Sequence, residues 1–220
     1  MLRTPSAPGY WDANFVRVEG DASMLDGPAL VRAGDLLLAA SHHRKFEIED
    51  EAAGARLRSF FEVVGWIVDR NAMMHRAGPA PVHADVEEVS LAATRPLRVE
   101  WYLGYDDDPA VQEALAATQD RIAVRRGMRA FIVRGESGQP VGFVMAAVPD
   151  GEDAIEIDQL YVTPDARGRG IGGRLVEAAI AAGGRDVAWV VADDDGKARA
   201  LYERLGFETV WLRHAVTRHP

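Results

Sequence analysis

A turn rich in glycine and arginine is the part of this 220-residue chain best suited to hold a charged ligand. The apolar run at residues 154–162 predicts a strand, and residues 170–182 predict a helix. Between them the chain reads Arg167-Gly168-Arg169-Gly170-Ile171-Gly172-Gly173. A helix that begins in such a turn has unpaired backbone N–H groups and the positive end of its dipole, which together favour phosphate. The turn therefore predicts an anion site, and its two arginines add positive charge.

Two familiar phosphate motifs fit this turn poorly. A Walker P-loop is excluded because no Gly-Lys-Ser/Thr follows. The dinucleotide pattern G-x-G-x-x-G is matched by Gly168, Gly170 and Gly173, with Asp193 at the place of a ribose-binding acid. However, the strand ends at Val162, well before the first glycine, and only 27 residues follow Asp193. A dinucleotide-binding oxidoreductase therefore stays a minor alternative.

A third pattern, R-x-x-G-x-G, is met by Arg167, Gly170 and Gly172 directly after a strand. A second block follows, with the spacing D-x-x-A-x-x-L-Y-x-x-x-G-F, made by Asp195, Ala198, Leu201, Tyr202, Gly206 and Phe207. Together the two blocks resemble the signatures of the GNAT superfamily of acyl-CoA N-acyltransferases. The resemblance covers about residues 86–217. It implies an α/β fold with a mixed sheet, the GNAT fold.

The resemblance also implies a reaction, in which a primary amine attacks the thioester of acetyl-CoA directly. Acetyl-CoA is the expected co-substrate and no metal is expected. The chain contains no cysteine, which agrees with a transfer that needs no enzyme thiol. The acceptor is expected to be a small-molecule amine, a protein N-terminus or a lysine. A non-catalytic acyl-CoA-binding regulatory module is the alternative.

The coenzyme-binding residues implied by the resemblance lie on the strand end, in the turn and before the next helix. They are Leu160, Tyr161, Val162, Arg167, Gly168, Arg169, Gly170, Ile171, Gly172, Gly173 and Asp195. The turn would bind the pyrophosphate through main-chain N–H groups. The backbones of Leu160 and Val162 would pair with the pantetheine arm as an added strand does. Asp195 is either a coenzyme contact or a helix N-cap.

Tyr202 matches the usual general acid of the family, which protonates the departing thiolate. The alternative is a tyrosine that packs on its helix with the hydroxyl in water. The tyrosine is therefore the first catalytic candidate.

The candidates for the general base are Glu156 and Asp158, with water as the alternative. Glu156 lies eleven residues before Arg167, the spacing of the catalytic glutamate in the histone-acetylating branch. Both acids share the parity of one strand and are expected on one face unless a bulge intervenes. Ile155, Ile157 and Tyr161 would then point to the other face.

Further elements surround this site in the sequence. A helix is predicted over 109–126, where Asp108 and Pro109 form a start signal. Strands are predicted at 129–134 and 140–148 as a hairpin, at 187–192 and at 207–216, with a helix at 197–205. The alternation predicts a mixed sheet.

The sequence divides at a linker rich in proline and glycine, residues 76–85. Residues 86–220 are expected to form the GNAT domain, and residues 1–85 a degenerate partial GNAT-like lobe. The reason is a short internal match, in which residues 60–66 repeat the pattern of residues 201–207 at an offset of 141, with Phe61 where Tyr202 stands. A small unrelated α/β appendage is the alternative. Strands expected at 14–19 and 66–75 would complete the sheet edge of the second lobe.

Composition limits the class of protein. The formal net charge is -9, which disfavours nucleic acid as a partner. No stretch approaches the roughly 20 apolar residues of a membrane span, and no signal-peptide pattern opens the sequence. We expect a cytoplasmic protein, monomeric or homodimeric, that binds neither nucleic acid nor membrane.

Overall fold

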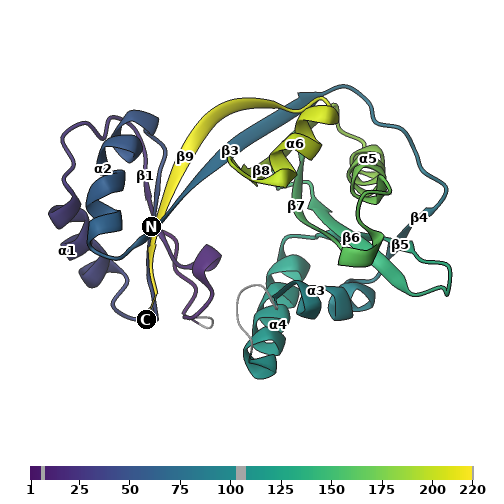
Figure 1. Ribbon diagram of the computed structural model, residues 1–220, viewed down its shortest axis with the longest axis horizontal. Coiled ribbons are helices and arrows are strands. Elements are labelled where there is room, and N and C mark those ends of the chain that lie inside the picture. Colours follow the sequence, from purple (N-terminus) through teal and green to yellow (C-terminus); the bar gives the residue numbers. More distant parts are fainter. Residues whose placement is uncertain (6–7, 103–107, 220) are drawn as a thin grey trace. The chain divides into compact units, whose positions relative to one another are not determined.

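The computed structural model describes residues 1–5, 8–102 and 108–219, which contain nine strands and six α-helices (Figure 1). The strands are β1 (Val16–Val18), β2 (Arg44–Ile48), β3 (Ile67–Ala77), β4 (Val86–Val89), β5 (Arg129–Arg134), β6 (Pro140–Ala147), β7 (Ala154–Val162), β8 (Val187–Asp193) and β9 (Glu208–Arg218). The helices are α1 (Gly27–Leu37), α2 (Glu51–Val63), α3 (Arg95–Tyr102), α4 (Pro109–Arg125), α5 (Ile171–Gly183) and α6 (Lys197–Arg204). No helix in the described part of the chain is long and apolar enough to cross a membrane.

The chain forms two compact units that differ from the sequence-based division at residue 85. The first unit comprises residues 1–73, 192–199 and 209–220, and the second comprises residues 74–191 and 200–208. The last strand of the chain thus belongs to the first unit.

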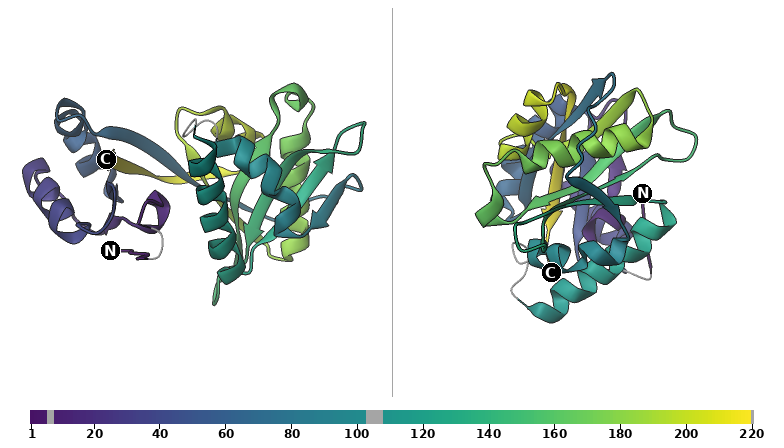
Figure 2. Two further views of the ribbon diagram at one scale, coloured as in Figure 1. Left: turned by 90° about the horizontal axis from the view of Figure 1, so that it is seen from below. Right: turned by 90° about the vertical axis from the view of Figure 1, so that its right-hand side faces the viewer.

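The second unit contains the elements predicted around the glycine turn. Its strands run in the order β3-β8-β7-β6-β5-β4, antiparallel from β4 to β7 and parallel between β7 and β8. Helix α5 packs against β5, β6 and β7, while α3 and α4 cover the opposite face, which Figure 2 shows. The predicted mixed sheet is confirmed, and each predicted element of this region is present within a few residues of its expected bounds. The short strand β4 and helix α3 were not predicted.

Helix α4 starts where the sequence signal placed it. The Asp108 side chain accepts a hydrogen bond from the Ala110 N–H at 2.8 Å, and Pro109 follows as the first helical residue. The helix ends before Gly127, whose φ of +59° favours glycine. The end of the helix thereby places its C-cap residue, Arg126, against the first half of β7.

A bulge interrupts β7 in the middle of the sheet. Leu160 pairs with Val144, but Ile157 pairs with Ala146, so β7 has one residue more than β6 between these pairs. The extra residue lies within Asp158–Gln159, opposite Met145. A bulge of this kind reverses the side-chain alternation beyond it.

The predicted orientation of Tyr161 is wrong because of this bulge. Tyr161 pairs with Phe143, and Glu156 pairs with Ala147. Phe143 and Ala147 both belong to the core beneath α3 and α4. Tyr161 therefore lies on the same face as the acids instead of the opposite one, whereas Ile155 does point away, against Gly183 of α5.

The first unit has its own sheet, in the order β1-β2-β9-β3. Strand β1 is parallel to β2, and β9 is antiparallel to β2. Helices α1 and α2 pack against one face of this sheet. The core between them includes Phe46, Ile48, Phe61, Trp66 and Val216. Strand β3 lies beside β8, as expected for the strand predicted at 66–75. The strand predicted at 14–19 lies instead at the outer edge, beside β2.

Two helix–strand junctions of the chain have the same backbone geometry. After α2, the Trp66 N–H donates to the Phe61 carbonyl at 2.9 Å; after α6, the Phe207 N–H donates to the Tyr202 carbonyl at 3.0 Å. A glycine with φ of +80° or +83° ends each helix. The strands that follow, β3 and β9, both contain 11 residues. The short internal match in the sequence thus corresponds to a repeated local structure.

The close fit of β9 on α2 yields a stability prediction. A Cβ at Gly54 would lie 2.4 Å from Cδ2 of His214, a residue that is 2% exposed. Gly54→Ala should lower the free energy of unfolding in urea by about 1–3 kcal/mol, because overpacking outweighs the gain in helix propensity. In a His214→Ala background the same change should become neutral or stabilising. Equal destabilisation in both backgrounds would contradict the contact.

Candidate active site

The glycine turn provides an open helix N-terminus. Gly168 and Gly170 have φ of +77° and +73°, the left-handed region that favours glycine. Gly170 is the N-cap of α5, and no side chain caps the helix there. The first N–H groups of α5 therefore face outward without a helical partner, as an anion site requires.

Two arginines hold the turn in shape. The Arg167 Nε donates to the Val162 carbonyl at 2.9 Å, and its guanidinium lies 5.7 Å from the centre of the Tyr161 ring. The Arg174 Nη1 donates to the Arg169 carbonyl at 3.0 Å. Arg167 thus ties the turn to the end of β7, while Arg174 ties it to the first turn of α5.

Gly172 allows α5 to approach both α6 and β7. A Cβ at Gly172 would lie 3.3 Å from Cδ2 of Leu201, and 3.7 Å and 3.9 Å from atoms of Leu160 and Val162. The side chains of Leu160 and Val162 therefore pack toward α5. Only their backbones are left to serve a ligand, in agreement with the role expected for them.

The sheet opens beside the bulge. Strand β7 pairs with β8 over Ala154–Ile157 and Val187–Val190, and Asp158 is the first β7 residue past this pairing within the described part of the second unit. The backbone of β7 beyond Ile157 is bonded to β6 on its other side. The opening exposes a strand edge between the glycine turn and the two candidate acids.

Both acids contact one arginine. The Arg126 Nη2 donates to Glu156 Oε2 at 2.5 Å, and its Nη1 donates to Asp158 Oδ2 at 3.3 Å. All three side chains are partly exposed, between 27% and 37%. The predicted placement of the two acids on one face is confirmed, because the bulge begins only at the second one.

Tyr202 lies in α6 and is 3% exposed. Burial raises the pKa of its hydroxyl, and the negative charge of Asp158 raises it further. The hydroxyl therefore stays protonated throughout the physiological range and is close enough to Asp158 to sense its charge. The alternative of a hydroxyl in bulk water does not fit this burial.

Tyr161 has a different environment. Its hydroxyl donates to Glu100 Oε1 of α3 at 2.9 Å, and burial followed by this hydrogen bond raises the pKa of the phenol. Tyr161 therefore links β7 to α3 at the edge of the site.

Asp195 is exposed, and α6 begins two residues later at Lys197. Gly196, not Asp195, stands directly before the helix. The neighbouring Asp194 is the buried acid of this turn, paired with Arg70 and Arg199. Asp194, and not Asp195, is therefore the acid that anchors this turn through ion pairs.

Sequence reasoning missed Arg126, Trp189 and His75. Trp189 is the cross-strand neighbour of Glu156, and its ring lies 5.2 Å from that of His75 at 31°. No sequence pattern marks Trp189, because residues 187–192 (Val-Ala-Trp-Val-Val-Ala) are all apolar and show no polar–apolar alternation. Arg126 reads as an ordinary basic residue at a helix end.

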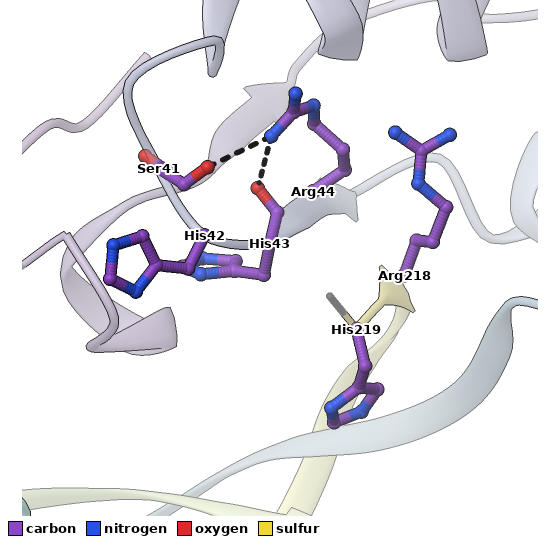
Figure 3. Close-up of a pocket in the computed structure, with 6 residues that line it drawn as sticks. All are labelled: Ser41, His42, His43, Arg44, Arg218 and His219. Atoms are coloured by element: carbon purple, nitrogen blue, oxygen red, sulfur yellow. Dashed lines mark hydrogen bonds between the residues drawn. The ribbon is translucent and has the colours of Figure 1, made fainter.

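The first unit contains a cavity of about 240 Å³ lined by Ser41, His42, His43, Arg44, Arg218 and His219 (Figure 3). Its arginines are occupied: the Arg44 Nη1 donates to three backbone carbonyls, and both guanidiniums bond Asp35. None of the predicted site residues lines it. Among residues 1–5, 8–102 and 108–219, no three metal-ligating side chains cluster.

Comparison with known proteins adds a family to this geometry. Residues 92–207 match the model of the Acetyltransferase (GNAT) family. An uncharacterised N-acetyltransferase of Methanocaldococcus jannaschii is 33% identical over 127 residues, which is 51% of this chain and 56% of that protein. The chain thus spans about half the length of this curated relative.

Solved structures resemble the fold at lower identity. A functionally unknown conserved protein from Staphylococcus epidermidis has a TM-score of 0.76 at 16% identity, covering 98% of this chain and 88% of its own. A tandem GNAT protein from the clavulanic acid biosynthesis pathway has a TM-score of 0.60 at 16% identity, covering 88% and 69%. These likenesses concern the fold alone.

Proposed function

The chain belongs to the GNAT acetyltransferase family, and from this premise we propose that it transfers the acetyl group of acetyl-CoA to a primary amine. One observation carries the proposal. Asp158 lies at the opening between β7 and β8, close enough to Tyr202 for its charge to act on the phenol. The glycine turn follows the end of β7. An acid, a base and an anion site thus surround one strand edge.

The residues of the second unit fit the coenzyme. The uncapped start of α5 offers N–H groups to a pyrophosphate, and Arg169 adds a positive charge beside it. The strand edge beyond Ile157 offers backbone groups to the amides of a pantetheine arm. Acetyl-CoA supplies a thioester, whose carbonyl carbon is open to attack.

The chemistry requires two proton transfers. Attack by the amine forms the C–N bond and breaks the C–S bond of the thioester. Asp158, directly or through water, accepts the proton that the amine loses. Tyr202 donates its hydroxyl proton to the departing thiolate, and its raised pKa keeps that proton available.

Two observations support Asp158 over Glu156 as the base. Asp158 is the one whose charge acts on Tyr202, whereas Glu156 lies within the paired part of β7 and β8. Glu156 also makes the shorter contact with Arg126. Asp158 is therefore the preferred base, and Glu156 is the second candidate.

We further infer that residues 1–85 are a degenerate half-copy that binds no coenzyme. The order β1-α1-β2-α2-β3 repeats that of β7-α5-β8-α6-β9, and β1–β2 is parallel like β7–β8. At the start of α1, however, the Asp26 side chain accepts from the Ala29 N–H at 2.6 Å. This carboxylate occupies an N–H group at the helix N-terminus and repels anions there. In addition, Phe61 lacks the hydroxyl of Tyr202.

Removing the proton donor tests the main proposal. Tyr202→Phe should lower kcat with acetyl-CoA by about 100-fold, since general acid catalysis is typically worth that much or more. The Kd for acetyl-CoA should change little. Release of free thiol gives kcat, and calorimetric titration gives Kd. Unchanged turnover would remove Tyr202 from the mechanism.

The two acids are separated by their pH–rate profiles. Asp158→Asn should lower kcat and remove the acidic limb of the profile, because no carboxylate then accepts the proton. Glu156→Gln should keep that limb. Glu136→Gln, in the exposed turn between β5 and β6, is the matched control. An acidic limb that survives in Asp158→Asn but not in Glu156→Gln would exchange the two roles.

The inference about the first unit predicts the stoichiometry of binding. Calorimetric titration of the full chain with acetyl-CoA should give one molecule per chain, and Gly170→Ala should weaken that binding at least several-fold, because a Cβ is strained at this φ. Two molecules per chain, or a second site that survives Gly170→Ala, would contradict a closed first unit.

A further inference from the structure

A row of side chains crosses the sheet of the second unit at the level of Glu156. Ala147 of β6 pairs with Glu156 of β7, which is the partner of Trp189 of β8. The ring of Trp189 lies 5.2 Å from that of His75 on β3. Cross-strand partners project on the same face, so the carboxylate of Glu156 lies between a small residue and an aromatic pair.

These side chains are accessible on the α3/α4 face. The side chain of Glu156 is 37% exposed, and Trp189 and His75 are half-buried. Ala147 has no side chain beyond Cβ that would cover the carboxylate. A ligand that enters from this face therefore meets an acid and an indole together.

The charges around Glu156 favour a cation. Arg126 contacts both Glu156 and Asp158, so one positive charge faces two negative charges. Gln159, in the bulge beside Asp158, is 3% exposed, and its Oε1 has no hydrogen-bond partner within the described part of the chain. Glu156, Asp158 and Arg126 together carry one formal negative charge. An ammonium group gains from both the carboxylate and the indole face.

The nitrogen that attacks the thioester cannot be the cation bound at Glu156. It must be neutral when it attacks the thioester, and it lies beside Asp158 and Tyr202 in the proposed reaction. Glu156 lies two residues before Asp158 on β7, so the Cα atoms of the two acids are about 7 Å apart along the strand. That distance is roughly the span of a four-carbon chain. The group bound at Glu156 must therefore be a second nitrogen that stays protonated.

We propose that the acceptor is an aliphatic amine with a second cationic group, such as an α,ω-diamine, and that Glu156 and Trp189 bind this second group. The inference rests on the proposed acetyl transfer and deepens it. Glu156 and Trp189 are then residues that determine acceptor specificity, and Asp158 serves the reacting end.

The test compares 1,4-diaminobutane with n-butylamine, which have equal chain length and differ by one amino group. For the full chain, kcat/KM should favour the diamine by about tenfold or more, the size of an ion pair reinforced by an aromatic face. Glu156→Gln and Trp189→Leu should each reduce this preference, whereas Trp189→Phe should retain part of it. Glu136→Gln should keep the wild-type preference.

Binding of each amine to the chain saturated with CoA, measured by calorimetry, separates the two proposals. Acetylation of both amines with equal kcat/KM would uphold acetyl transfer and overturn the inference about the acceptor. Tighter binding of the diamine that Glu156→Gln abolishes, without any turnover, would uphold the site and count against acetyl transfer. Failure of the diamine to bind or to react preferentially would overturn the inference.

Discussion

The site depends on the point where β7 stops pairing with β8. Up to Ile157 the strand pairs on both sides, and from Leu160 onward it pairs, among the strands that the structure describes, with β6 and not with β8. The bulge at Asp158–Gln159 coincides with this point and adds local twist. One backbone irregularity thus opens the sheet, leaves Asp158 at the opening and turns Tyr161 toward Glu100. A regular strand would close the edge that an extended ligand needs.

The two faces of the sheet bring different side chains to this opening. The α5 side provides the glycine turn, and Gly172 lets α6 approach closely enough for Tyr202 to lie near Asp158. The α3/α4 side provides Arg126, the acids and Trp189. In the proposed transfer, a donor held from one side and an acceptor held from the other meet where the sheet is open. The motifs all belong to the α5 side, so under this proposal they describe the donor and leave the acceptor unnamed.

The sequence predicts the second unit well and the acceptor side poorly, for physical reasons. Caps, glycine turns and alternating strands are local signals, so Asp108, Gly170 and the β5–β6 hairpin are found where expected. The bulge has no local signal, and parity reasoning therefore fails beyond Asp158. Arg126 and Trp189 reach Glu156 only through pairing of distant strands and packing of α4. The membership of β9 in the first unit is likewise a long-range pairing, with β2.

The repeated junction shows that burying the hydroxyl of Tyr202 has a cost in free energy. Phe61 and Tyr202 occupy the same position before the same glycine cap, and both are buried, at 0% and 3% exposure. A phenylalanine satisfies this packing without a polar group, as the first unit demonstrates. Burying a hydroxyl instead carries a desolvation penalty that a phenylalanine avoids. Packing alone does not require the oxygen at this position, whereas a proton donor at the opening of the sheet does.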